Sequence, residues 1–512
     1  MQGNWLNILI VVFVTLGSFS YGYSASIIAS TLGQSAFVRY LDLDPTVNPH
    51  AESLQGATNG IFQAGGFFGA LLITPVADKL SRRCSILMSC LLLVVGGALQ
   101  AGSVHIGMFL AMRFITGMGV GMVVGSVPLY QSEISPPKVR GLLVGLHGVM
   151  ISVGYAAAGW IGYACYPLEG NIQWRLPLGI QCIAPGILAL GSYVLPESPR
   201  WLLQNDRTDE AFDVIRRIHG EGAQAEFTQM CCQAEVERAC QQSMSTFKQL
   251  RQPHNLKRPA LGFALMFGGQ TTGTLVLNNY GVSLYTKLGY SGQSAIALTA
   301  GWVTVSIPGN LFLAFFVDRI GRIRMLLYGF IAIVFILVGE MIATGLPNQS
   351  SGNNIAAIFF LYCHIAVYGL CIDATTYIYV SEIFPTRMRA IGSSISISGL
   401  FVASIIYTQS ATSAFSNIGW KYYLVFTTTS ALMAVCLSLF FPETKGLSLE
   451  EIDTCFGDPG PDLYLGDNST GGGHRNQARC SMWNRWSEFM NRSFSHEYRL
   501  YCSLIYVNLR LE

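Results

Sequence analysis

One acidic residue stands in the middle of a long apolar stretch. Asp373 lies within residues 354–380, which contain no other Asp, Glu, Lys or Arg. Thr376 and Tyr377 follow three and four residues later, so a helix would place them on the same face as Asp373. A carboxylate in this position can accept a hydrogen bond from a ligand hydroxyl, bind a cation or carry a proton. The alternative is a structural hydrogen bond or ion pair.

Two further charged residues interrupt apolar stretches. Arg113 and Glu340 each stand alone in such a stretch. A charge placed in hydrocarbon is costly and needs compensation from neighbouring groups. Arg113, Glu340 and Asp373 are therefore the predicted buried charges.

Uncharged polar residues form a second set of candidates. Tyr21 and Ser24 share one helix face, and Asn278 is followed directly by Asn279. We interpret Tyr21, Ser24 and Asn279 as candidate ligand contacts. For the adjacent asparagines, a hydrogen bond between helices is an equally good interpretation.

The elements that hold these residues must be membrane-spanning helices. Of the 512 residues, 51% are hydrophobic and 12% are charged, against ~25% charged in a typical soluble protein. A helix of about 20 apolar residues crosses a bilayer, and twelve stretches fit that length. They are residues 5–31, 56–77, 84–104, 108–130, 143–166, 176–195, 260–281, 293–316, 325–346, 354–380, 392–414 and 421–441.

Basic residues gather on one side of these spans. If the N-terminus is cytosolic, all but five of the 31 Lys and Arg residues fall in cytosolic segments. This asymmetry predicts that both termini are cytosolic. The net charge of +2 gives no reason to expect a nucleic-acid partner.

Three short motifs recur in the second half of the chain, in the same order. Each falls after the second, fourth or sixth span of its half. Two such halves are typical of transporters, whose substrate site lies between them near the midplane. We expect an all-α membrane protein with six-helix halves at 1–196 and 260–441, a linker at 197–259 and a largely disordered tail at 442–512. The repeats are Asp78-Lys-Leu-Ser-Arg82 with Asp318-Arg-Ile-Gly-Arg322, Tyr130-Gln-Ser-Glu133 with Tyr379-Val-Ser-Glu382, and Pro196-Glu-Ser with Pro442-Glu-Thr.

The repeated motifs bring acids and bases together at helix ends on the cytosolic side. Such charges can form a network that holds this side shut and breaks when it opens. They can also serve only as topology signals and helix caps. The predicted network contains Asp78, Arg82, Arg83, Glu133, Arg140, Glu197, Arg200, Asp318, Arg322, Glu382, Arg389 and Glu443.

Several segments form a joint signature. They are Arg113-Phe-Ile-Thr-Gly117-Met-Gly119-Val-Gly121, Pro128-Leu-Tyr130-Gln-Ser-Glu133, Pro196-Glu-Ser-Pro-Arg200-Trp, Gly321-Arg322, Ser381-Glu-Ile-Phe-Pro385 and Pro442-Glu-Thr-Lys-Gly446. Together they resemble the motifs of the sugar porter family of the major facilitator superfamily. The segment from Gly22 to Gly33 is most similar to fungal members. The resemblance covers about residues 5–455 and implies twelve helices, a central site and alternating access.

The chain departs from this family at positions that the resemblance implies are functional. Ser24 stands where proton-coupled members have an acid beside Arg113, so we do not expect proton coupling through this position. Gly148 replaces an implied sugar-binding amide, and only Gln270 remains of a glutamine pair. A buried hexose needs a partner for each hydroxyl. Either the ligand is larger and less polar, or new groups such as Asp373 take over.

The resemblance implies transport of a sugar or a similar polyhydroxylated small solute, across the plasma membrane. Export of a secondary metabolite or another non-sugar compound is the alternative, and a nutrient receptor that signals through its tail is a third. No nucleophile–base or metal-ligand cluster appears, so we expect neither an enzyme nor a bound cofactor. We also expect a monomer, glycosylated at Asn348 if that sequon lies outside the cell.

Overall fold

The structure is a computed structural model. It describes residues 2–135, 140–219, 253–345, 351–385 and 388–447, with residues 224, 227, 228, 230, 231, 452 and 456. Within these ranges, the side chains at 2–6, 140–144, 219, 253–255 and 351 are not described. The sequon at Asn348, the side chain of Arg140 and the tail from residue 457 therefore lie outside the described part.

The first half is dominated by long helices, and a short α2 (Ser35–Tyr40) follows the first of them. The long helices are α1 (Gln2–Leu32), α3 (Ala51–Lys79), α4 (Arg82–Ala101), α5 (Ile106–Ile134) and α6 (Arg140–Cys165). The predicted sixth span is instead two helices of nine residues, α7 (Ile172–Ile180) and α8 (Ile183–Gly191). Proline cannot donate to the carbonyl four residues earlier, and Pro185 lies four residues after the break at Gln181.

A linker follows, with α9 (Pro199–Gln204) and α10 (Thr208–His219). The apolar residues of α10 recur at helical spacing. Ala211, Ile215 and Ile218 form its buried side.

Several helices of the second half are interrupted. Its elements are α13 (Pro253–Gln270), α14 (Thr274–Lys287), α15 (Gln293–Thr304), α16 (Ser306–Ile320), α17 (Arg322–Gly345), α18 (Ser351–Val367), the π-helical turn η2 (Tyr368–Ile372), α19 (Asp373–Glu382), α20 (Arg389–Asn417), the 3₁₀ turn η3 (Gly419–Tyr422) and α21 (Tyr423–Phe440). α13 and α14 are separated at Gly273, which has a φ of 80°. Glycine tolerates this left-handed conformation because it has no Cβ.

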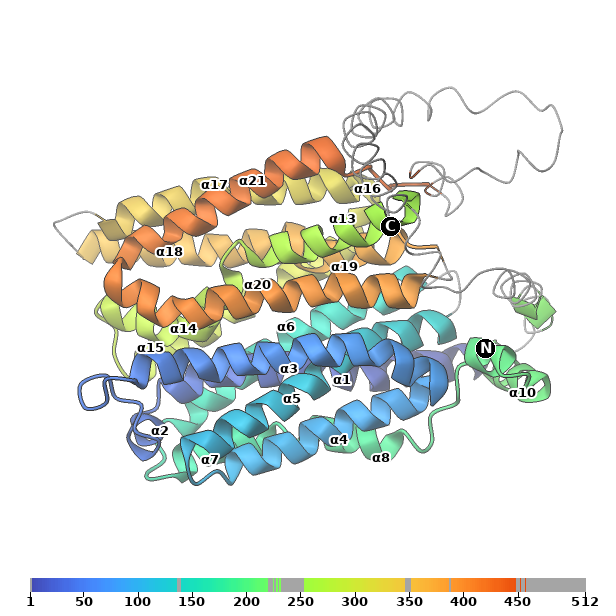
Figure 1. Cartoon of the computed structure of the whole chain (residues 1–512), viewed down its shortest axis with the longest axis horizontal. Helices are drawn as coiled ribbons and strands as arrows, with labels where there is room; N and C mark the ends of the chain where they lie inside the picture. The colour runs from blue at the N-terminus through green and yellow to red at the C-terminus, as the bar shows by residue number, and fades with distance from the viewer. Residues whose placement is uncertain are drawn as a thin grey trace, which may run out of the picture.

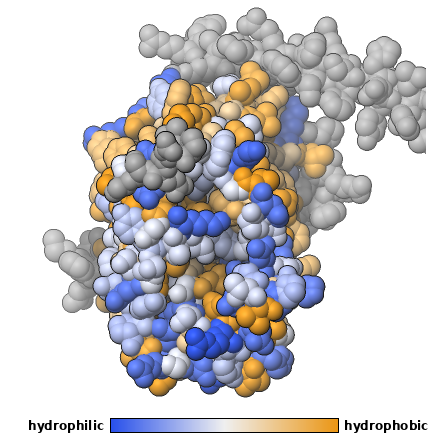
Figure 2. All heavy atoms as spheres, turned by 90° about the vertical axis from the view of Figure 1, so that its left-hand side faces the viewer, coloured by the Kyte–Doolittle hydropathy of each residue, from blue (hydrophilic) through white to orange (hydrophobic). Residues whose placement is uncertain are grey.

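The long helices run side by side, with the first half in the lower part of Figure 1 and the second half in the upper part. The start of α1, α10 and the end of α21 lie together at one end of the bundle. We call this end the terminal face and the other end the opposite face. Figure 2 shows the opposite face, where hydrophilic and hydrophobic residues are interspersed.

Glycines allow helices of the first half to approach each other closely. A Cβ on Gly22 of α1 would lie 2.0 Å from the carbonyl oxygen of Ile151 in α6. A Cβ on Gly117 of α5 would lie 2.1 Å from the carbonyl oxygen of Phe62 in α3. In hydrocarbon, such backbone proximity replaces the hydrophobic effect as a source of packing energy.

The two halves meet along a seam between α3 and α20 and between α6 and the pair α15–α16. Near the terminal face, the hydroxyls of Thr74 and Ser394 are 2.6 Å apart. Near the opposite face, the amide of Asn59 donates to the hydroxyl of Tyr280 over 3.1 Å. Polar contacts that link the halves are therefore present toward both faces.

Eleven helical segments among the described residues are long and apolar enough to cross a membrane. Each matches one of the twelve predicted spans, and α7 with α8 covers most of the remaining one. The prediction of an all-α membrane protein with two helical halves is confirmed.

Candidate functional site

Tyrosines from both halves meet near the middle of the bundle. The side chain of Tyr21 in α1 interacts with those of Tyr155 in α6 and Tyr377 in α19. The rings of Tyr21 and Tyr155 meet edge to face, with centroids 6.2 Å apart. Tyr368 in η2 interacts electrostatically with Tyr21 and with Asp373. We call these four tyrosines with Asp373 the central cluster.

Asp373 is held by a residue that the sequence did not single out. The side-chain nitrogen of Asn310 in α16 donates to Oδ2 of Asp373 over 2.8 Å. The same nitrogen donates to the hydroxyl of Ser152 in α6 over 2.7 Å. Because Ser152 belongs to the first half, Asn310 connects the acid of one half to a helix of the other.

Three other predicted contacts lie beside the central cluster. Gln270, at the end of α13, is 3.5 Å from the hydroxyl of Tyr368. Thr376 donates to the backbone carbonyl of Asp373 rather than into the space between the halves. A Cβ on Gly148 would lie 3.2 Å from that of Ala374, so this glycine sits where α6 meets α19.

His147, next to Gly148, also belongs to this region. Its Nδ1 lies 2.7 Å from the hydroxyl of Ser18. Its ring meets that of Tyr377 edge to face, with centroids 6.1 Å apart. The imidazole thus positions a tyrosine of the central cluster.

Asn278 and Asn279 lie in α14, farther toward the opposite face. The amide of Asn278 donates to the side chain of Asn279 over 3.3 Å, and Ser26 of α1 lies 3.5 Å from Asn278. The side-chain nitrogen of Asn279 is buried without a partner among the described residues. Both interpretations of this pair stay open, because Asn278 joins two helices while Asn279 keeps an unused donor.

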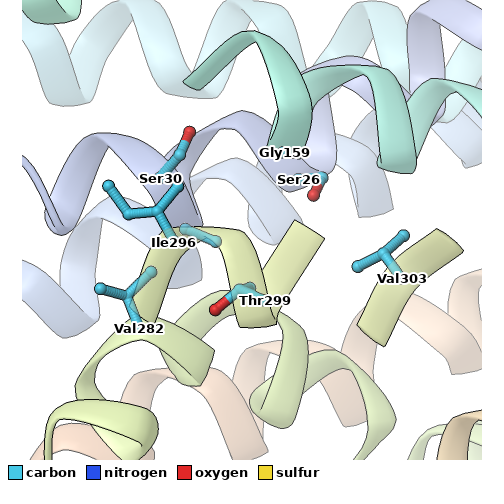
Figure 3. A pocket seen from close by; sticks show the side chains of 8 residues that line it. Ser26, Ser30, Gly159, Val282, Ile296, Thr299 and Val303 are labelled. Carbon is cyan, nitrogen blue, oxygen red and sulfur yellow. The ribbon is translucent and has the colours of Figure 1, made fainter. Parts of the chain in front are cut away.

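A small pocket lies beside α14, between the two halves. Residues of α1, α6, α14 and α15 line it, among them Ser26, Gly159, Val282 and Thr299 (Figure 3). Beyond it, a Cβ on Gly33 would lie 2.7 Å from the side chain of Val282. Because Gly33 directly follows α1 and Val282 belongs to α14, the two halves also approach each other closely here.

Arg113 carries a charge with no carboxylate partner among the described residues. Its guanidinium donates to the carbonyl oxygens of Thr58 and Ser24, over 3.1 and 3.2 Å. It also lies over the ring of Phe62, 4.2 Å from the centroid. Two carbonyl dipoles and an aromatic face therefore compensate this buried charge. Ser24 takes part through its backbone, which any residue type could supply.

Glu340 is placed differently from the other predicted charges. Its side chain in α17 is 2% exposed, and neither carboxyl oxygen has a hydrogen-bond partner among the described residues. It interacts electrostatically with Tyr285 of α14 and Tyr423 of α21. Tyr285 lies near the end of α14 and Tyr423 begins α21, so Glu340 lies toward the opposite face, away from the central cluster.

Replacing Glu340 by methionine is expected to stabilise the protein. A buried polar group without a partner costs about 1–3 kcal/mol, so the free energy of unfolding should rise by a similar amount. Thermal unfolding of the purified protein in detergent would measure the change. Asp213→Met, on the exposed side of α10, serves as the control and should shift unfolding little. A lower melting temperature for Glu340→Met would contradict the prediction.

The repeated motifs form one charge cluster in each half, at the terminal face. Arg82 binds Asp78 over 3.0 Å and Glu133 over 3.2 Å. In the second half, Arg322 binds Asp318 and Glu382, both over 2.7 Å. Each of these bonds joins elements of a single half. The expected network therefore exists as two separate clusters, and the described ion pairs do not link the halves.

The glutamate of the third repeated motif joins each cluster by accepting a hydrogen bond from a backbone nitrogen. A carboxyl oxygen of Glu197 accepts from the backbone nitrogen of Arg83 over 3.3 Å. Glu443 accepts equivalently from the backbone nitrogen of Arg322 over 2.8 Å. Arg200 is the second residue of α9, and Arg389 is the first residue of α20.

Four residues of the site were missed by sequence reasoning: Ser152, Tyr155, Asn310 and Tyr368. Each is an uncharged polar residue surrounded by mainly apolar neighbours in the sequence. A sequence signal exists only for Ser152 and Tyr155, which lie four and seven residues after Gly148. That spacing places them on one helix face with Gly148.

Comparison with known proteins agrees with this architecture. The family described as "Sugar (and other) transporter" matches residues 10–456. The MFS-type transporter criB of Aspergillus cristatus is 35% identical over 455 residues, covering 87% of this chain and 92% of the relative. The high-affinity glucose transporter of Kluyveromyces lactis and the quinate permease of Neurospora africana are each 28% identical over 477 residues. The match to the glucose transporter covers 87% of this chain and 84% of that relative. The match to the quinate permease covers 88% of this chain and 89% of that relative.

Solved structures show the same fold. The proton:xylose symporter XylE bound to 6-bromo-6-deoxy-D-glucose superposes with a TM-score of 0.76 at 22% identity. The match covers 88% of this chain and 100% of that one. A partially occluded inward-open form of XylE from E. coli gives a TM-score of 0.72 at 21% identity, covering 86% of this chain and 98% of that one.

The fold and the matched family define a multi-pass membrane transporter of the major facilitator superfamily, not an enzyme. Within that superfamily, the chain belongs to the sugar (and other) transporter family.

Proposed function

We propose that this protein moves a small polyhydroxylated, ring-containing solute, with a sugar as the first candidate, by alternating access between its two halves. The observation that carries the proposal is the central cluster. Its tyrosines and Asp373 come from both halves near the middle of the bundle. Such a position suits a solute that is reached first from one side of the membrane and then from the other.

The chemistry of the central cluster supports a solute with hydroxyl groups. Tyrosine hydroxyls donate and accept hydrogen bonds, and a carboxylate accepts them. Asp373, Tyr377 and Gln270 are partly exposed, so they border open space rather than a packed core. Aromatic rings add flat apolar surface against which a sugar ring or an aromatic ring can pack.

The two charge clusters support rigid movement of each half. Arg82 and Arg322 each tie the ends of three elements together within one half. We propose that they keep each half intact while the seam rearranges, with both termini cytosolic and the protein a monomer in the plasma membrane. The charges were first expected to form an inter-helix network that holds the cytosolic side shut; the described ion pairs do join helices, but only within each half.

Export of a secondary metabolite or another non-sugar compound is the second candidate function. One observation favours it: the aromatic character of the central cluster, where the rings of Tyr21 and Tyr155 meet edge to face and that of Tyr377 meets His147. An exporter would take up no labelled sugar.

The test is uptake of labelled glucose in cells that lack their own hexose carriers. Tyr21→Phe and Tyr377→Phe should raise the KM by about 2–10-fold, because each removes one hydrogen bond of about 0.5–1.5 kcal/mol. Tyr328→Phe is the control, since this tyrosine is 61% exposed on α17. We also expect a protonophore to leave uptake unchanged, because Arg113 contacts the Ser24 backbone instead of an acid.

Two outcomes would count against the proposal. Unchanged uptake in both tyrosine variants would place the solute elsewhere. No uptake of any sugar, with the protein present at the cell surface, would favour metabolite export. Uptake abolished by the protonophore would leave sugar transport in place and reject only the facilitator assignment.

A further inference from the structure

We propose that the central cluster selects neutral or cationic solutes and rejects carboxylates. This inference rests on the proposed function and names the charge class of its substrate. It starts from the orientation of Asp373. Oδ2 accepts a hydrogen bond from Asn310 over 2.8 Å, whereas no hydrogen bond from the described residues reaches the other carboxyl oxygen. That oxygen is available to a solute because the side chain is partly exposed.

Asn310 determines which hydrogen-bonding groups it and Asp373 leave free for a solute. Its side-chain nitrogen donates its two hydrogens to Ser152 and to Asp373. The amide oxygen is buried and has no partner among the described residues. Asp373 and Asn310 together therefore offer acceptors and no spare donor. A solute must bring the donor, which a hydroxyl or a protonated amine can do and a carboxylate cannot.

No cation in the described part compensates for Asp373. Arg113 is fully buried, and its bonds go to the carbonyls of Ser24 and Thr58. The other ionisable groups around Asp373 are tyrosines and His147, whose contacts are the hydroxyl of Ser18 and the ring of Tyr377. Repulsion between like charges is strong where water is scarce. The binding free energy of an anionic solute is therefore less favourable at this site.

This selectivity would separate the chain from some of its relatives. The quinate permease of Neurospora africana is 28% identical, and quinate is a carboxylate. Overall similarity therefore does not decide the charge class of the solute, whereas the pairing of Asp373 with Asn310 does.

Three related compounds test the proposal: neutral glucose, cationic glucosamine and anionic glucuronate. Each of the two charged compounds differs from glucose at a single group. Binding to the purified full-length protein is measured by the ligand dependence of its melting temperature. Glucuronate should bind at least about tenfold more weakly than glucose and glucosamine, which corresponds to about 1.4 kcal/mol. Asp373→Asn keeps the shape of the side chain and should shrink this discrimination to within a few-fold.

Glu340→Gln is the matched control, because that acid lies away from the central cluster and should leave the order of binding unchanged. Glucuronate binding as tightly as glucose to the unmodified protein would overturn the selectivity while leaving the proposed function in place. An unchanged order of affinities in Asp373→Asn would also overturn it. Failure of all three compounds to bind would overturn the proposed function, and the selectivity with it.

Discussion

Arg82→Ala is expected to abolish folded protein at the membrane. Arg82 donates to Asp78, to Glu133 and to the backbone carbonyl of Ala77, and its side chain is 5% exposed. The side chain of Glu133 is 6% exposed, so the variant would leave a buried carboxylate without its cation. Removing one partner of a buried ion pair costs about 3–5 kcal/mol, a large part of a typical total stability of about 5–15 kcal/mol.

Size-exclusion chromatography of a fluorescent fusion, with surface labelling, would measure this loss. Arg207→Ala is the matched control, because it removes an ion pair with Glu210 whose side chains are 48% and 55% exposed. Such surface pairs contribute about 0–1 kcal/mol, so the control should behave like the unmodified protein. Arg322→Ala should reproduce the defect in the second half. A monodisperse Arg82→Ala protein of unchanged melting temperature would contradict the prediction.

Gly22→Val is expected to prevent α1 from packing on α6. A Cβ at this position would lie 2.0 Å from the carbonyl oxygen of Ile151 and 2.9 Å from the backbone nitrogen of Tyr155. Backbone atoms cannot rotate away as side chains do, so the two helices would have to separate. Ordinary overpacking costs about 1–3 kcal/mol, and this contact should exceed that range. It would also displace Tyr21 and Tyr155 from each other.

Expression and transport of Gly22→Val would be compared with those of Gly179→Ala. Gly179 lies in α7 with nothing within 4 Å of the position of an added Cβ. Alanine is favoured over glycine in a helix by about 1 kcal/mol, so the control should be neutral or slightly stabilising. Normal transport by Gly22→Val would mean that α1 and α6 are less closely packed than described.

The repeated motifs predicted the clusters at the terminal face because the same contacts occur twice. Tyr130 donates to the backbone carbonyl of Pro196 over 2.7 Å, and Tyr379 donates equivalently to that of Pro442 over 3.1 Å. A tyrosine in one motif and a proline in another are thus bonded in each half. Duplication therefore predicted which motifs belong together, although it did not reveal that each cluster stays within its own half.

The central site was only partly predictable. Asp373 stood out because a charge in an apolar stretch is rare. Asn310 did not, because an isolated amide carries no periodic signal and its partner Ser152 is distant in sequence. In a helix that is apolar on all sides, the sequence does not tell which side faces the other half. Such pairs arise from tertiary packing alone.

The breaks in the second half distinguish it mechanically from the first. α1, α5 and α6 run without interruption, whereas the second half changes course at Gly273 and again at the π-helical turn η2. These three long helices of the first half are continuous, whereas two spans of the second half are broken beside the central cluster. Asp373 directly follows η2, and Gln270 lies just before Gly273. If the central cluster holds the solute as proposed, the solute lies beside both breaks, and the energy of its binding can bend the second half against the continuous helices α1, α5 and α6.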